Sequence, residues 1–81
     1  MIKLLSPADA GILSTVAGDV FDDPILESSV REFLADPRHR LIVALDEDLV
    51  VGFVSAVIYL HPDKPSPELW INEVGVSPIY Q

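Results

Sequence analysis

Residues 40–60 read RLIVALDEDLVVGFVSAVIYL, and this stretch decides the fold. Its two apolar runs, 40–45 and 49–60, have the composition of strands, and the acidic residues 46–48 between them suit a tight turn. We therefore predict an antiparallel hairpin. The first run shows no polar alternation, which is typical of a strand buried on both faces. Gly52 inside the second run indicates a bulge or a close backbone approach.

Two helices are predicted between a short first strand and this hairpin. Residues 2–5 form an apolar run, and Ser6 then offers an N-cap for a helix over residues 8–17, where apolar positions recur at helical spacing. Asp23 offers the cap of a second helix. That helix is expected to end at Asp36, because the residue before a proline is pushed out of the helical region.

A third strand of the main sheet is predicted near the carboxyl end. Residues 61–67 contain three prolines and read as a loop. Residues 68–76 then return to an extended pattern. The order strand, helix, helix, strand, strand, strand predicts a single α+β domain, with helices packed on a mostly antiparallel sheet.

Composition and charge exclude several classes of function. The 81 residues carry 13 acidic and five basic side chains, a net charge of -8, which argues against nucleic acid as a partner. A cationic substrate and simple solubility are both compatible with this charge. No cysteine is present, and His39 and His61 lack the spacing of metal ligands. Without a signal peptide or a membrane span, we expect a cytoplasmic protein.

The last strand carries a family motif. Residues 69–81 read LWINEVGVSPIYQ. Within them residues 76–80 fit the pattern V-x-P-x-Y, and Gln81 fits the first position of the glycine-containing loop that follows it in the Gcn5-related N-acetyltransferase (GNAT) superfamily. Residues 51–53, VGF, fit that family's third strand. The chain therefore resembles this family over its whole length, and the coupling of the two motifs makes the resemblance more specific than either motif alone.

This resemblance implies a fold and an activity. Residues 1–81 would be a single truncated N-acetyltransferase domain, the amino-terminal half of an acyl-CoA N-acyltransferase fold. HPDK at 61–64 with EVGV at 73–76 is most similar to the aminoglycoside 3-N-acetyltransferase-like branch. The implied reaction transfers an acetyl group from acetyl-CoA to a small-molecule amine, such as an aminoglycoside or a polyamine. Because the family's phosphate-binding loop follows Gln81, we expect this chain alone to be weakly active or inactive.

The resemblance also implies a catalytic strand. Glu73 would act as general base, and the backbone N–H groups of Val74, Gly75 and Val76 would polarise the thioester carbonyl. Gln81 would belong to the cofactor site. The missing side chain of Gly75 fits either a plain bulge or a place where the pantetheine arm passes close to the backbone.

Strict alternation along the last strand would place Glu73 on one face with Leu69 and Ile71. Apolar neighbours would reduce its solvation and move it toward a base usable near neutral pH. A solvated glutamate on an edge strand is the alternative interpretation.

Three further acidic residues, Asp22, Asp23 and Glu27, would shape the acceptor pocket by the same resemblance and hold a cationic amine. Helix caps and solvated loop residues are the alternative interpretation of these charges.

Two other functions remain open at this point. The last strand has little charge to protect its edge, so the chain could be a non-catalytic interaction module that forms a homodimer through this strand. An unrelated acidic α+β domain is the other alternative. A last strand that splays from its neighbour would argue against it, and a plain closed sheet would support it.

Overall fold

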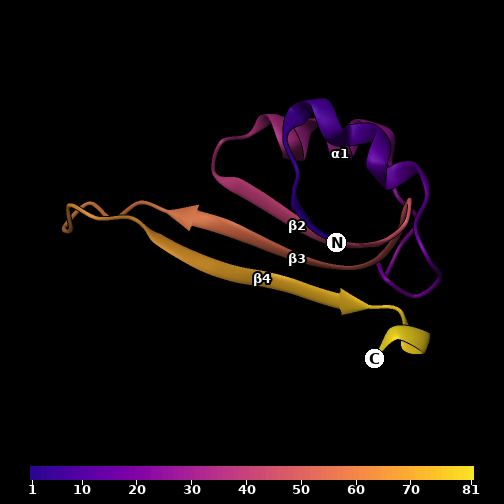
Figure 1. The fold of residues 1–81 in the computed structure, drawn as a ribbon. Helices are drawn as coiled ribbons and strands as arrows, with labels where there is room; N and C mark the ends of the chain where they lie inside the picture. The colour runs from indigo at the N-terminus through magenta and orange to yellow at the C-terminus, as the bar shows by residue number, and fades with distance from the viewer.

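The computed structural model describes residues 1–81, which form one four-stranded sheet with a helical layer on one of its faces (Figure 1). The elements are the strands β1 (Ile2–Leu4), β2 (His39–Asp46), β3 (Leu49–Tyr59) and β4 (Glu68–Val76), the α-helix α1 (Glu27–Ala35), and the 3-10 helices η1 (Pro7–Ser14) and η2 (Pro78–Tyr80). The strand order is β1-β2-β3-β4, and every neighbouring pair is antiparallel. The predicted α+β fold with a mostly antiparallel sheet is confirmed.

The predicted hairpin is formed by β2 and β3, joined by a two-residue turn in which Glu47 has a φ of 54°. Ala44 pairs with Gly52, whereas Leu45 pairs with Val50, so Val51 is an extra residue on β3. The bulge expected beside Gly52 is thus confirmed.

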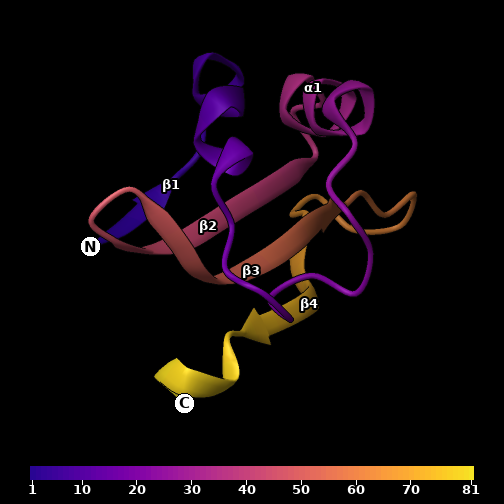
Figure 2. The same ribbon diagram turned by 90° about the vertical axis from the view of Figure 1, so that its right-hand side faces the viewer.

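Burial of β2 differs from the prediction. Leu41 is 5% exposed and Val43 is fully buried, but Ile42 between them is 38% exposed. The expectation that this strand is buried on both faces was wrong, because η1 and α1 cover only one side of the sheet (Figure 2).

The first predicted helix begins as expected but is a 3-10 helix that ends at Ser14. At its start, the backbone N–H of Ser6 donates to the Asp9 carboxylate at 2.8 Å. Beyond its end, Val50 N–H donates to the Thr15 carbonyl oxygen at 3.0 Å, and Ala17 N–H donates to the Val50 carbonyl oxygen at 2.9 Å. The backbone of β3 therefore takes the groups that a longer helix would have used.

The second helix starts later than predicted, at Glu27 rather than directly after Asp23. Val20 is 4% exposed in the core, and the Phe21 ring stacks on Phe53 with centroids 4.1 Å apart. This anchoring draws the loop across the sheet before the helix begins. The predicted end is confirmed, since α1 stops at Ala35. No helix of the structure combines the length and the apolar character that crossing a membrane requires.

β4 remains hydrogen-bonded to β3 along its length, from the pair Tyr59–Glu68 to the pair Gly52–Val76. It does not splay from this neighbour, and its other edge has no partner strand. The hydrophobic core lies between the helical layer and the sheet, and its buried members are Leu5, Leu13, Val20, Val30, Leu34, Leu41, Val43, Val50 and Phe53.

Candidate functional site

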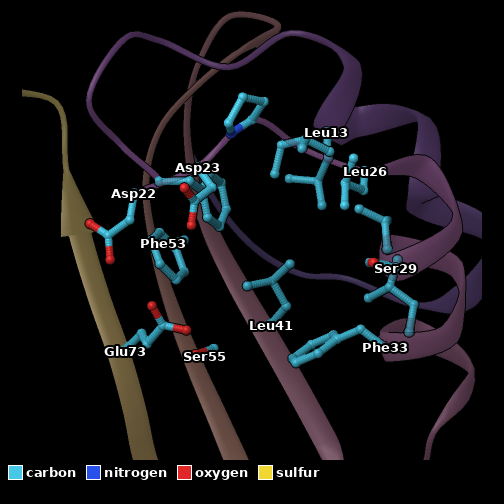
Figure 3. Close-up of a pocket in the computed structure, with 15 residues that line it drawn as sticks. Leu13, Asp22, Asp23, Leu26, Ser29, Phe33, Leu41, Phe53, Ser55 and Glu73 are labelled. Atoms are coloured by element: carbon cyan, nitrogen blue, oxygen red, sulfur yellow. The ribbon is translucent and has the colours of Figure 1, made fainter.

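A cavity of about 300 Å³ lies between α1, the loop before it and the covered face of the sheet (Figure 3). Most of its lining is apolar, with walls formed by Leu13, Ile25, Val30, Phe33, Leu34 and Leu41. Small-molecule sites typically combine such walls with a few polar groups. The polar groups here are therefore the candidates for chemistry.

Three carboxylates reach this cavity. Asp22 and Asp23 come from the loop and Glu73 comes from β4, and all three lie around the Phe53 ring (Figure 3). None of the fifteen lining residues is basic. The ion pairs of the chain use other carboxylates, namely Asp9, Glu27, Asp36 and Glu68. Three unpaired negative charges at one side of an apolar cavity favour a cationic ligand.

The orientation of Glu73 depends on a bulge that the sequence analysis missed. Ser55 pairs with Glu73, but the next β3 residue, Ala56, pairs with Ile71, so Asn72 is an extra residue on β4. Directly paired residues point to the same face, so Glu73 lies with Ser55 on the covered face and Ile71 lies on the other. Strict alternation, which grouped Glu73 with Leu69 and Ile71, was wrong. The Glu73 side chain is also exposed, so the expected loss of solvation is absent.

Ser55 is a site residue that sequence reasoning missed. It lines the cavity, is only 5% exposed, and has no protein partner for its Oγ. Buried hydroxyl groups nearly always have a hydrogen-bond partner. The available signal was one serine at an inward position of an otherwise apolar strand, opposite an acidic residue.

Glu27 lies away from the other predicted acceptor residues. It forms an i,i+4 ion pair with Arg31 on the exposed surface of α1, and it lines a separate hollow beside η1. The structure thus brings Asp22, Asp23 and Glu73 together but not Glu27.

Gly75 allows the loop that contains Val20 to pack closely against β4. A Cβ at this position would lie 2.2 Å from the Val20 carbonyl oxygen and 2.6 Å from the Phe53 ring. The bulge of β4 lies at Asn72, so a bulge at Gly75 was the wrong interpretation. Close packing of the loop onto β4 accounts for the glycine.

The open edge of β4 carries unpaired backbone groups. Ser77 N–H donates to the Val51 carbonyl oxygen at 2.8 Å. This bond determines which residues of β4 direct their backbone groups toward β3. By alternation, Val74 and Val76 turn their N–H groups to the open edge. The side-chain amide of Gln81 donates to the Val76 carbonyl oxygen at 3.2 Å, in agreement with that direction. Two backbone donors are therefore free to meet a carbonyl group at this edge.

The sequence matches no protein-family model and no curated protein. Its fold, however, matches solved structures over its full length. An aminoglycoside acetyltransferase from an uncultured soil metagenomic sample matches with a TM-score of 0.76 at 18% identity, over 60% of that chain. A ribosomal-protein-alanine N-acetyltransferase from Brucella melitensis biovar Abortus 2308 matches with a TM-score of 0.71 at 18% identity, over 59% of that chain. An aminoglycoside N-acetyltransferase in complex with CoA matches with a TM-score of 0.67 at 17% identity, over 57% of that chain.

These matches decide between the fold alternatives. The likeness covers 100% of this chain, so an unrelated α+β fold is no longer an open alternative. Aminoglycoside and protein acetyltransferases match at nearly equal identity, so the likeness does not single out one branch. The chain spans about 60% of the length of the solved structures it matches. It has part of the acyl-CoA N-acyltransferase fold that these acetyltransferases share.

Proposed function

We propose that the protein transfers an acetyl group from acetyl-CoA to an amine. The observation that carries this proposal is the position of Glu73, on the strand next to the open edge and beside the cavity that Asp22 and Asp23 also border. The fold shared with N-acetyltransferases supports the reaction class. Fold alone does not determine function, so the residues of this site have to support the reaction.

Glu73 is proposed to remove the proton that keeps the amine unreactive. Aliphatic amines are mostly protonated at neutral pH, and only the neutral form can attack a carbonyl carbon. The exposed carboxylate of Glu73 can accept this proton directly or through one water molecule. General base catalysis of this kind contributes about 10²–10⁴-fold to a rate.

Asp22 and Asp23 are proposed to hold the cationic acceptor. Neither carboxylate is committed to an ion pair, and no basic side chain lines the cavity to compete for them. Aminoglycosides and polyamines both carry the ammonium groups that such a site attracts. Glu27 is engaged with Arg31, so it is not part of this proposal.

The open edge of β4 is proposed to receive the acyl donor. Acetyl-CoA would supply the activated acetyl group as a thioester. The outward N–H groups of Val74 and Val76 can donate to a carbonyl oxygen there, and donors of this kind stabilise the charge that develops on it. Gln81 lies at the same end of β4 and holds the Val76 carbonyl oxygen.

The proposal is tested by following thiol release from acetyl-CoA in the presence of amines that include an aminoglycoside, a polyamine and simple primary amines. From residues 1–81 alone we expect weak release that depends on the amine, and the double variant Asp22→Asn/Asp23→Asn should raise the KM for the amine about tenfold. Asp63→Asn removes an exposed acidic residue outside the cavity and serves as the matched control. Thiol release that never exceeds the rate without protein would refute the proposed activity.

A second candidate function is self-association through the last strand. The β4 side chains Leu69, Ile71 and Val74 are 62%, 61% and 64% exposed, and the β4 edge has no partner. Uncovered strands of this kind tend to pair with another chain. A stable dimer that acetyl-CoA does not alter, together with absent acetyl transfer, would favour this function over catalysis.

A further inference from the structure

The strongest unexplained feature of the cavity is the Ser55 hydroxyl. Its Oγ has no protein partner although the residue is 95% buried, and it faces the same cavity as Glu73. Because Ser55 and Glu73 are direct partners, their Cβ atoms lie about 4.5–5.5 Å apart. One nitrogen atom can therefore reach both side chains once the Ser55 hydroxyl, which is closed to solvent in this structure, turns toward the cavity.

We propose that Ser55 and Glu73 together bind a single primary ammonium group whose substituent is a compact apolar body. This inference rests on the proposed acetyl transfer and names the acceptor class for the same site. A primary ammonium has three N–H donors, so one can go to Ser55 Oγ and one to the Glu73 carboxylate. Asp22 and Asp23 at the same side of the cavity add to the attraction of the cation.

The walls of the cavity determine which substituent the ammonium group can carry. Beyond the carboxylates the lining is apolar, with the stacked rings of Phe21 and Phe53 on one side and Phe33 and Leu34 of α1 on another. Hydroxyl or ammonium groups placed against these walls would lose their water without gaining partners. A volume of about 300 Å³ also suits a small molecule better than a multi-ring sugar. An arylalkyl or branched alkyl amine meets both conditions.

The pairing of Ser55 with Glu73 also provides an acceptor for the proton that the ammonium group must lose before it reacts. The ammonium nitrogen gives one proton to the Glu73 carboxylate, which becomes a neutral carboxylic acid. The resulting neutral amine keeps its N–H bond to Ser55 Oγ and gains a free lone pair for attack. Ser55 therefore acts as a positioning residue that holds the amine after Glu73 has taken the proton.

Binding of 2-phenylethylamine, spermidine and sisomicin to the unmodified protein, measured by calorimetry without acetyl-CoA, tests the acceptor class. We expect 2-phenylethylamine to bind at least tenfold more tightly than the other two. Equal or tighter binding of spermidine or sisomicin overturns the proposal. Since no acyl donor is present, this result is independent of whether acetyl transfer occurs.

Ser55→Ala tests the role of the hydroxyl, with Ser28→Ala on the exposed side of α1 as the matched control. We expect Ser55→Ala to weaken 2-phenylethylamine about tenfold and to raise Tm, because it removes a buried hydroxyl that lacks a partner. Ser28→Ala should change neither. A purely structural role for Ser55 predicts the opposite pattern, a lower Tm with unchanged amine affinity, and that outcome overturns the inference while leaving the acetyl-transfer proposal intact.

Discussion

Ser55 on β3 and Glu73 on β4 are direct cross-strand partners, and their side chains share the face of the sheet that the helices cover. The bulge at Asn72 determines this relationship, because it resets the alternation of β4 between Ile71 and Glu73. An exposed carboxylate therefore lies beside an apolar cavity instead of on the open face of the sheet.

Glu73→Gln is expected to lower kcat for amine acetylation by about 10²–10⁴-fold, because glutamine cannot accept the proton of the amine. The amide has nearly the same shape, so the free energy of unfolding should change little. Thiol release at saturating amine measures kcat. Glu32→Gln changes an exposed glutamate on α1 that does not line the cavity, and it should leave kcat unaltered. Equal activity of the two variants would remove Glu73 from the reaction.

Gly75→Ala is expected to destabilise the fold by about 2 kcal/mol or more, because its Cβ would overlap the Val20 carbonyl oxygen and the Phe53 ring. Gly11→Ala is the matched control, since a Cβ there meets no atom within 4 Å. That substitution should be neutral or stabilise by up to about 1 kcal/mol. Urea unfolding of the two variants compares these values, and a Gly75→Ala variant as stable as the parent would contradict the close approach of the loop to β4.

Strands and turns of this fold are predictable because their signals are local. The apolar runs, the acidic turn around Glu47 and the prolines of the 61–67 loop act through neighbouring residues, and each led to the correct element. The helices were predicted less well because distant contacts decide them. Val50 bonds to the backbone of residues 15 and 17 and shortens η1, and the stacking of Phe21 on Phe53 delays α1.

The candidate site, too, was predicted from the sequence only in part. Asp22, Asp23 and Glu73 were identified as acidic residues in a family context, and the fold brings them to one cavity. The face of Glu73 was predicted from strict alternation, and a bulge has no reliable signature in a sequence of this kind. Ser55 was missed because its importance lies in the absence of a partner, which only the folded packing reveals.

Asp36 is expected to make the stability of the fold depend on pH in the acidic range. Hydrogen bonds from the side chain and then the backbone N–H of Arg38 lower the pKa of Asp36 from 3.8 to about 2. A carboxyl group with a lowered folded pKa stabilises the fold above its unfolded pKa, and this contribution is lost as the pH falls toward the folded value. Asp36→Asn should therefore be less stable than the parent at pH 7, and the difference should close between pH 3.8 and about 2.

Thermal unfolding at a series of pH values measures this difference. Asp63→Asn removes an exposed carboxylate that forms no ion pair, and it controls for the change in net charge. A gap between Asp36→Asn and the parent that stays constant from pH 7 to pH 2 would show that the ionisation of Asp36 contributes nothing to stability.

Val74→Lys is expected to suppress any self-association through β4. Val74 is 64% exposed on the uncovered face, and its backbone N–H turns to the open edge of the sheet. A lysine there places a charge where a second chain would have to pack, which is a common protection of strand edges. Leu60→Lys is the matched control, because Leu60 is 77% exposed but lies in the loop after β3.

Sedimentation velocity over a range of concentrations should show dimer for the parent and for Leu60→Lys but monomer for Val74→Lys. Dimers that persist in Val74→Lys would place the contact elsewhere, and a parent that stays monomeric at all concentrations would leave catalysis as the only function proposed for this strand.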